Sequence, residues 1–249
     1  MKILDPPAAS VLAGRSSVAG RVAAGTQRRR WQRHAAAWED HAVAGLESVI
    51  EAVIAETGRS PLGVVVDIGC GGGALALRLA ARAERLIAVD VSPAMLETLE
   101  QRAAGSALDN IELCCESIEG FDVTEGSVDL VVSNYALHHL LDRDKQRFVT
   151  KAAGWLRPGG KLVMGDMMIG RGLQQEDRRI LARKARVLVA RGPGGWWRVV
   201  KNAWRLLSRT VERPVPIRTW TEMLHQAGFV DVTARRVVSE AAVVTGTRR

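Results

Sequence analysis

The stretch that most constrains the fold lies at positions 64–73 and reads VVVDIGCGGG. Three consecutive valines and an isoleucine make both faces of a short segment apolar, which is typical of a strand buried inside a parallel sheet. Four glycines follow within five positions: Gly69, Gly71, Gly72 and Gly73. Glycine weakens a strand but suits a tight turn where a ligand lies against bare backbone. The segment Ala74–Arg82 then predicts a helix whose N-terminal amides point back at that turn.

A second apolar strand is predicted at Leu86–Asp90, and it ends in an acid. Ser92 is suited to cap the following helix, with Pro93 at its first position. A carboxylate at the end of the second strand is well placed to accept hydrogen bonds from ribose hydroxyl groups beside the glycine turn. The pattern therefore predicts a site for an adenosine-containing ligand on a doubly wound sheet.

Two ligand classes fit this pattern. The spacing GxGxxA over positions 69–74, with Asp90 at the expected distance, satisfies the relaxed dinucleotide fingerprint and would suit NAD(P). The alternative spacing is DxGxGxG over positions 67–73, an acid at the strand end followed by three alternating glycines. A glycine motif alone does not decide between them, so the rest of the chain has to.

Size and composition limit the function classes. A chain of 249 residues with 47% hydrophobic residues is long enough for one domain with a sizeable lid. No apolar run approaches the length of a membrane-spanning helix, and the first residues lack the apolar stretch of a secretion signal. The three cysteines fit no metal-site spacing, which predicts small core residues in a reducing compartment and no bound metal. We therefore expect a cytoplasmic protein.

The order of predicted elements indicates an α/β fold. Residues 1–25 predict a flexible N-terminal segment, and residues 26–249 a single domain that begins with one or two amphipathic helices. Strands and helices then alternate, which predicts a Rossmann-like, doubly wound, mostly parallel sheet of seven strands ending in a C-terminal β-hairpin. The predicted strands are 64–68, 86–90, 111–115, 128–132, 161–166 and two within 229–247; the predicted helices after the first strand include 74–82, 93–104, 143–155 and 220–227.

Further motifs arrive in a fixed order: VDVSPAML at 89–96, CESIEGF at 115–121, VDLVVSNYALHHL at 128–140, LRPGGKLVMGDM at 156–167 and LHQAGFVDV at 224–232. Together with DIGCGGG at 67–73, they resemble the class I S-adenosylmethionine-dependent methyltransferases, in the broad group that includes ubiquinone- and menaquinone-biosynthesis enzymes and many small-molecule methyltransferases. The resemblance covers roughly positions 31–247. The Pro-Gly-Gly turn and the AGF junction are not features of dinucleotide dehydrogenases. The resemblance therefore favours S-adenosyl-L-methionine over NAD(P) as the cofactor.

The resemblance implies a cofactor role for each matched position. The implied cofactor-binding residues are Asp67, Gly69, Cys70, Gly71, Gly73, Asp90, Val91, Met95, Glu116, Ser117 and Asn134. Asp67 would hold the ammonium group, Asp90 the ribose hydroxyls and Glu116 the adenine amino group, where the family usually has the shorter aspartate. Met95 is equally consistent with a core residue, and Asp67 with an acid that stabilises the turn.

Methyl transfer places few demands on the protein, because the cofactor carries the activated methyl group. A base is needed only when the acceptor is protonated, as a phenol or an alcohol is. His138 and His139 follow the fourth strand and are the candidate catalytic residues, since histidine titrates near neutrality. The pair is also consistent with packing the short helix there, and Tyr135 and Asp166 are weaker candidates. Positions 133–136 read SNYA rather than NPPY, which argues against methylation of nucleic-acid bases on nitrogen.

An insert at 170–217 stands where related enzymes place a substrate lid, and residues 171–213 contain twelve Lys and Arg against three acidic residues. Over 178–209, three tryptophans occur among many basic residues, which is consistent with a lid, with peripheral contact to an anionic membrane, or with nucleic-acid binding. Nucleic acid is the least favoured partner, because only 4% of the residues are aromatic and no known RNA-binding module is appended. We predict methyl transfer, with O-methylation favoured, to a small lipophilic acceptor such as a quinone, phenol, lipid or secondary metabolite. An RNA methyltransferase, an NAD(P)-dependent oxidoreductase and a non-catalytic cofactor-binding protein are the alternatives.

Overall fold

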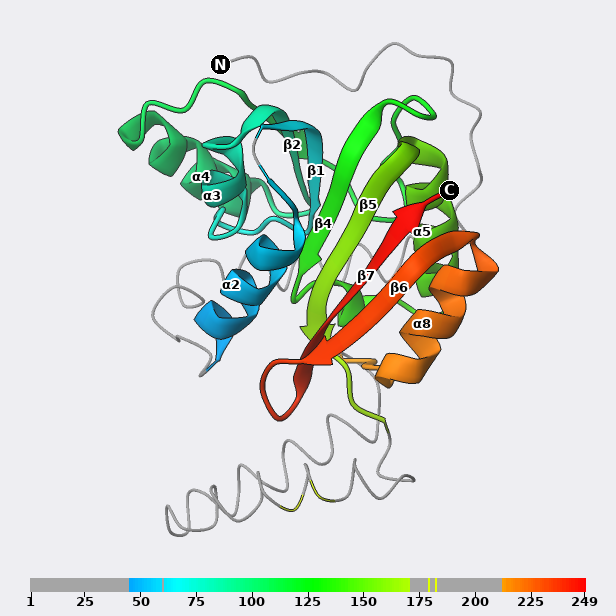
Figure 1. The fold of residues 1–249 in the computed structure, drawn as a ribbon. Coiled ribbons are helices and arrows are strands. Elements are labelled where there is room, and N and C mark those ends of the chain that lie inside the picture. The colour runs from blue at the N-terminus through cyan, green and yellow to red at the C-terminus, as the bar shows by residue number, and fades with distance from the viewer. Residues whose placement is uncertain (1–44, 60, 171–178, 180–181, 183–211) are drawn as a thin grey trace, which may run out of the picture.

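The computed structural model describes residues 45–59, 61–170, 179, 182 and 212–249. Its centre is a seven-stranded sheet with the order β3-β2-β1-β4-β5-β7-β6 (Figure 1). Strands β1 to β5 are parallel, and β7 is antiparallel to both of its neighbours. The bounds are β1 Leu62–Ile68, β2 Ala83–Asp90, β3 Ile111–Cys115, β4 Val128–Asn134, β5 Leu156–Met167, β6 Phe229–Arg236 and β7 Ala241–Arg248. The predicted α/β class, the mostly parallel sheet and the C-terminal hairpin are confirmed.

Helices cover both faces of the sheet. On one face lie α2 (Leu46–Glu56), α3 (Ala76–Ala80) and α4 (Pro93–Gly105), and on the other α5 (Asp142–Trp155) and α8 (Ile217–Gln226) (Figure 1). Each face has its own apolar cluster. Val65 and Val66, neighbours on β1, are both fully buried and belong to different clusters. Strand β1 therefore has no solvent-facing side, which explains the run of three valines in its sequence.

Several element boundaries differ from the prediction, among them those of one helix and one strand. The helix after the glycine turn was expected over 74–82, but α3 covers only Ala76–Ala80. It starts late because the turn extends through residues 71–75, and it ends early because β2 begins at Ala83. The fifth strand begins at Leu156 rather than at position 161, so the Pro-Gly-Gly sequence lies within it, where the pairing of β4 with β5 shifts register.

Several predictions from the sequence fall on other parts of the chain. The flexible segment 1–25, and most of the insert 170–217 with the expected membrane contact at 178–209, lie outside the described residues. Among the helices that the structure does describe, none is long and apolar enough to cross a membrane. Within the same ranges, no group of three or more His, Cys, Asp or Glu side chains is arranged to hold a metal ion.

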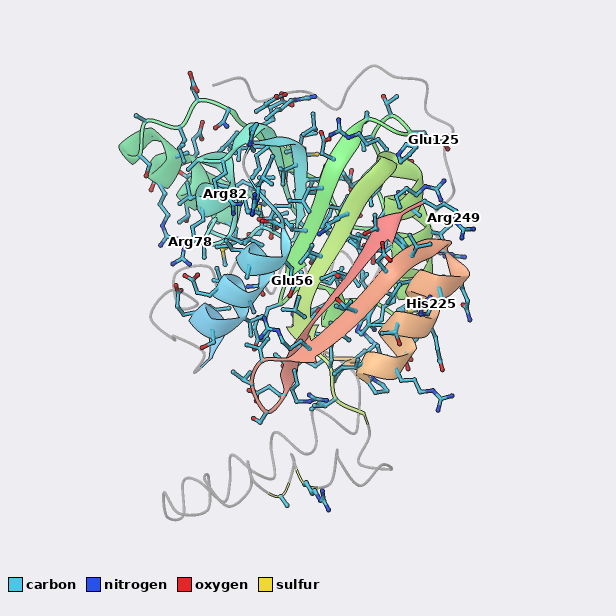
Figure 2. All side chains as sticks on the ribbon, viewed as in Figure 1. Glu56, Arg78, Arg82, Glu125, His225 and Arg249 are labelled. Atoms are coloured by element: carbon cyan, nitrogen blue, oxygen red, sulfur yellow. The ribbon has the colours of Figure 1, made fainter. Side chains whose placement is uncertain are left out.

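Arg78 joins two helices on one face of the sheet (Figure 2). Its guanidinium, on α3, lies 2.5 Å from a carboxylate oxygen of Glu47 and 2.6 Å from one of Glu51, both on α2. All three side chains are substantially exposed. The contacts therefore connect α2 and α3 at the surface without forming part of the core.

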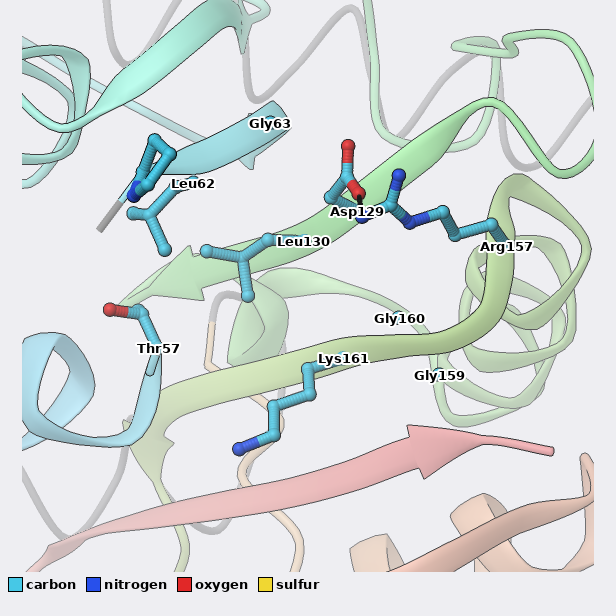
Figure 3. A pocket seen from close by; sticks show the side chains of 10 residues that line it. Thr57, Leu62, Gly63, Asp129, Leu130, Arg157, Gly159, Gly160 and Lys161 are labelled. Atoms are coloured by element: carbon cyan, nitrogen blue, oxygen red, sulfur yellow. Dashed lines mark ion pairs between the residues drawn. The ribbon is translucent and has the colours of Figure 1, made fainter. Parts of the chain in front are cut away.

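An open cavity of about 220 Å³ lies at the amino-terminal edge of β1 and β4 (Figure 3). Asp129 pairs there with Arg157, and its carboxylate also accepts a hydrogen bond from the Val64 N–H at 2.7 Å. Ligands of doubly wound sheets bind beyond the carboxyl ends of the strands, at the opposite edge. We therefore regard this cavity as a structural feature rather than as the functional site.

Candidate cofactor and active site

The three alternating glycines of the turn after β1 all have positive φ, at +71° for Gly69, +52° for Gly71 and +88° for Gly73. Their surroundings differ. A Cβ on Gly69 would lie 2.3 Å from the Cβ of Ala136, and one on Gly73 would lie 2.3 Å from Cδ1 of Leu99. A Cβ on Gly71 would meet no atom within 4 Å. Two glycines are thus required by packing, whereas the third faces open space at the carboxyl edge of the sheet.

Asp90, at the end of β2, fixes the conformation of the same turn. Its carboxylate accepts a hydrogen bond from the N–H of Gly71 at 3.0 Å and another from the N–H of Ser92 at 2.8 Å. Burial raises the pKa of Asp90, and the backbone N–H groups of Ser92, Gly71 and Val91 oppose that increase. Ser92 occupies the N-cap position of α4, but its side chain makes no capping hydrogen bond, contrary to the sequence prediction.

Asp67 is the most perturbed acid at this edge. The residue is 1% exposed, and its Oδ2 has no hydrogen-bond partner in the part of the chain described. Burial, and then the charge of Asp90, raise the pKa of Asp67 from 3.8 to about 8. The same causes, in the same order, raise the pKa of the neighbouring Cys70 thiol, so that the thiol stays neutral. A positive group placed here would stabilise the Asp67 carboxylate by attraction between opposite charges.

Asn134, at the end of β4, supplies a second unsatisfied acceptor. Its Oδ1 is buried and, among the described residues, has no hydrogen-bond partner. Ser133, the preceding residue, donates a hydrogen bond to the carbonyl of Ile68 at 2.8 Å and so connects the ends of β1 and β4. An ammonium group donates three hydrogen bonds and accepts none, so it complements the two free oxygens of Asp67 and Asn134.

The residues expected near the adenine lie at the ends of β2 and β3. Val91 is half-buried, Met95 in the first turn of α4 is 3% exposed, and Glu116 is exposed. Glu116 Oε1 accepts hydrogen bonds from the Ser117 N–H at 2.6 Å and from the Ser117 hydroxyl at 3.1 Å. The N–H of Glu116 in turn donates to the carbonyl of Asp90 at 3.1 Å, which brings the proposed ribose and adenine contacts together.

His138 and Asp166 form a buried pair on the α5 side of the same edge. His138 Nδ1 lies 2.5 Å from Asp166 Oδ1, and the backbone N–H of His138 donates to Asp166 Oδ2 at 2.9 Å. The two residues are 5% and 1% exposed. The ring of His139 lies against that of His138, with centroids 4.0 Å apart. Of the two histidines, His138 is therefore the one oriented by a carboxylate.

Tyr135 precedes this pair and has an unusual backbone. Its φ is +53°, which is rare for an aromatic residue, and its N–H donates to the carbonyl of Gly165 at 2.8 Å. Burial, followed by the charges of Glu240 and Asp166, raises the pKa of the Tyr135 phenol above its usual value. A phenol that holds its proton so firmly is a hydrogen-bond donor and not a base.

Comparison with known proteins finds similarity to methyltransferases. Residues 65–160 match the family model described as "Methyltransferase domain". An uncharacterized methyltransferase of Mycobacterium tuberculosis is 36% identical over 106 residues, which are 42% of this chain and 51% of that protein. Residues 65–160 thus match a methyltransferase domain, in agreement with the resemblance of the sequence motifs to the class I S-adenosylmethionine-dependent methyltransferases.

Other matches support the methyltransferase fold. A carboxy-S-adenosyl-L-methionine synthase of Shewanella loihica is 29% identical over 115 residues, 44% of this chain and 46% of that protein. The solved DhpI–SAM–HEP complex superposes with a TM-score of 0.65 at 16% identity, covering 89% of this chain and 96% of that one. Geranyl diphosphate methyltransferase has a TM-score of 0.63 at 14% identity, covering 82% and 79%. The chain spans about half the length of the curated relatives it matches.

The match to a methyltransferase domain supports S-adenosyl-L-methionine as the cofactor and favours it over the nicotinamide alternative. The residues present fit the cofactor, because Asp67 and Asn134 offer unsatisfied acceptors for its ammonium group and Gly71 leaves room beside the backbone. The structure brings together, around the carboxyl edge, all eleven of the positions that the sequence motifs predicted.

Sequence reasoning underestimated two positions in the methyltransferase site. Asp166 was only a weak candidate, yet it orients His138. Gly165, beside it, was not singled out, although a Cβ there would lie 2.9 Å from Asn134 Oδ1 and closer still to valines of α2. The glycine between two strand residues of LVMGDM is the signal that a close backbone approach occurs at this point.

Proposed function

We propose that this chain transfers a methyl group from S-adenosyl-L-methionine to an oxygen atom of a small, lipophilic acceptor. The observation that carries the proposal is the His138–Asp166 pair, which lies buried beside the unsatisfied acceptors of the cofactor site. The pair matters because an oxygen acceptor such as a phenol must lose its proton, whereas the cofactor needs no activation by the protein.

In the proposed reaction, each proton has a defined position on the His138–Asp166 pair. Asp166 accepts at Oδ1, so Nδ1 of His138 carries the hydrogen and Nε2 holds the free lone pair. The second oxygen of Asp166 holds the backbone of His138 and fixes the position of the ring. When Nε2 takes the hydroxyl proton of the acceptor, the Asp166 carboxylate stabilises the resulting imidazolium. S-Adenosyl-L-methionine, when bound, supplies a methyl group activated by its sulfonium.

His139 and Tyr135 support the pair in other ways. The ring of His139 lies against that of His138 at an interplanar angle of 44° and restricts it. Tyr135 lies edge-on to His138, with ring centroids 6.4 Å apart, and its buried hydroxyl has no hydrogen-bond partner in the described chain. The phenol of Tyr135 is thus available to donate a hydrogen bond to an oxygen of the acceptor.

The lipophilic character of the acceptor is proposed from the sequence of the insert 170–217. Tryptophans and basic residues over 178–209 would suit a lid that contacts an apolar acceptor or the surface of an anionic membrane that contains it. The protein would then act in the cytoplasm, in part at the membrane surface. An RNA acceptor is the alternative, and it predicts RNA binding whose affinity falls steeply with salt.

The first test is calorimetric titration of the full chain with S-adenosylhomocysteine and, separately, with NADH and NADPH. Micromolar binding of S-adenosylhomocysteine alone, abolished by Asp90→Ala, is expected. Binding of a nicotinamide cofactor alone would overturn the proposal.

The second test follows transfer of a labelled methyl group to lipophilic phenols and quinols, with and without anionic vesicles. We expect His138→Asn to reduce the rate by about 10²–10⁴-fold, the usual contribution of a general base. His139→Asn is the matched control and should change the rate far less. Equal losses in the two variants would show that the histidines act through packing.

A further inference from the structure

The loop that follows β3, residues 116–122, is held by α5 on the face of the sheet opposite α2, α3 and α4. Lys151 of α5 donates hydrogen bonds from Nζ to the carbonyl of Phe121 and to that of Glu119, the latter at 3.4 Å. The same nitrogen lies 3.8 Å from Asp122 Oδ2. One cation on α5 therefore binds three successive parts of this loop.

Trp155, one turn further along α5, strengthens the attachment. Its indole N–H donates to Asp122 Oδ1 at 2.6 Å, and its ring packs edge-on against Phe121 with centroids 5.3 Å apart. Lys151 Nζ also lies 5.5 Å from the centroid of the indole ring, within the range of a cation–π interaction. Phe121 is 5% exposed and belongs to the apolar cluster of that face.

The electrostatics of the loop depend on the same lysine. Burial lowers the pKa of Lys151, and the carboxylates of Asp122, Glu116 and Glu119 act in the opposite direction. Burial, and then the charges of Asp144 and Glu116, raise the pKa of Glu119, whereas Lys151 opposes this increase. Removing the lysine would leave these carboxylates facing one another without the cation.

The backbone at Gly120 links Lys151 to Glu116. The two carbonyls that Lys151 binds, those of Glu119 and Phe121, stand on either side of Gly120. A Cβ on Gly120 would lie 2.6 Å from Glu116 Oε1 and 3.0 Å from the Ser117 hydroxyl. The Gly120 N–H also donates to that hydroxyl at 3.1 Å. The backbone at position 120 is therefore in contact with the carboxylate expected at the adenine amino group.

We propose that Lys151 is a positioning residue for cofactor recognition, which sets the Glu116 carboxylate through the backbone of Gly120 and so determines selectivity for an adenine carrying its amino group. The proposal rests on the proposed cofactor site. Lys151 touches no part of the cofactor in it; its effect is transmitted through residues 119–121. The extra methylene of Glu116 makes such support necessary, because a longer side chain has more rotamers to restrict.

The test compares two probes by calorimetry on the full chain: S-adenosylhomocysteine, and S-inosylhomocysteine, in which an oxygen replaces the adenine amino group. Lys151→Met should weaken binding of S-adenosylhomocysteine about tenfold, the value of one charge-assisted hydrogen bond, and leave S-inosylhomocysteine unchanged. Lys161→Met is the matched control, since Lys161 lines the cavity at the opposite edge of the sheet. Gly120→Ala provides a second variant, in which the new Cβ displaces the flexible Glu116 carboxylate, and it should cause the same loss of selectivity.

The outcomes distinguish the positioning role of Lys151 from the proposed cofactor site. Equal weakening of both probes by Lys151→Met, or no change for either, would overturn the positioning role while leaving the cofactor site intact. A wild-type chain that binds neither probe would overturn the cofactor site itself. A Gly120→Ala variant that still prefers S-adenosylhomocysteine as strongly as the wild type would break the link between residue 120 and Glu116.

Discussion

Gly71 offers the most direct test of where the cofactor lies. Its φ of +52° is accessible to alanine at a cost of about 1–2 kcal/mol, and the added methyl group would meet no protein atom within 4 Å. The Gly71→Ala chain should therefore fold. The methyl group would nevertheless occupy the space in which the methionine part of the cofactor approaches the backbone, so we expect binding of S-adenosylhomocysteine to weaken at least tenfold.

Gly126 supplies the matched control. Its φ is +64°, a Cβ there would also meet nothing within 4 Å, and it lies in the turn before β4, at the opposite edge of the sheet. Gly126→Ala should lose the same 1–2 kcal/mol of unfolding free energy as Gly71→Ala, or about 2–8 °C in melting temperature for a chain of this size. It should bind S-adenosylhomocysteine like the wild type.

Gly69→Ala extends the comparison to a glycine required by packing. Its Cβ would lie 2.3 Å from that of Ala136, so this variant should lose more stability than either of the others. Melting curves give the stabilities, and calorimetric titration gives the affinities. The reasoning is refuted if Gly71→Ala has the same melting temperature as Gly126→Ala but binds S-adenosylhomocysteine as tightly as the wild type. The cofactor would then not lie against Gly71.

The remaining predictions concern charge. Because the pKa of Asp67 is about 8 and an ammonium ligand requires the carboxylate, affinity for S-adenosylhomocysteine should rise up to about tenfold per pH unit from pH 6 to 8 and then level off. Calorimetry at each pH measures it, and Asp67→Asn should abolish the trend. Between pH 4 and 8 the folded state keeps a proton on Asp67, whereas the unfolded state has released it, because its pKa there is 3.8. The free energy of unfolding should therefore fall as the pH rises through this range, by up to about 1.4 kcal/mol per pH unit. Denaturation across that range should show a shallower slope in Asp67→Asn, and an unchanged slope would contradict the assignment. Arg78→Ala should cost less than about 1 kcal/mol in urea unfolding despite its two short contacts, since the ion pairs are exposed.

The sequence was most informative for buried elements, where burial determines which residue types can occur. The apolar run of β1, buried on both faces, and the alternation of strands and helices predicted the sheet, including its C-terminal hairpin. The helix after the glycine turn was predicted too long, because alanine and leucine favour a helix wherever they occur, whereas the turn and the start of β2 limit α3 to five residues. At this point the short connection between β1 and β2 outweighs the helix propensity of the residues.

Contacts between distant residues could not be predicted in the same way. The sequence named His138 and His139 equally, and the preference for His138 arises only because the end of β5 places Asp166 beside it, 28 residues away. Lys151 was not predicted at all, since a lysine on an amphipathic helix normally faces solvent. Its function depends on the path of the loop 116–122, which no local pattern determines.

Buried polar atoms without a hydrogen-bond partner also occur elsewhere among the described residues, on Asn110, Asp129 and Asp144, but four of them gather at the carboxyl edge. Asp67 Oδ2, Ser92 Oγ, Asn134 Oδ1 and the Tyr135 hydroxyl are all buried and lack a hydrogen-bond partner in the described ranges, and all four follow or end β1, β2 or β4. Each such group costs about 1–3 kcal/mol, which is a large share of the 5–15 kcal/mol by which a domain is usually stable. A ligand bound at this edge would recover part of that cost. Since the four groups comprise two acceptor oxygens and two hydroxyls, a ligand with an ammonium group on one side and an oxygen-bearing acceptor on the other would recover it, and binding should stabilise this edge more than any other part of the sheet.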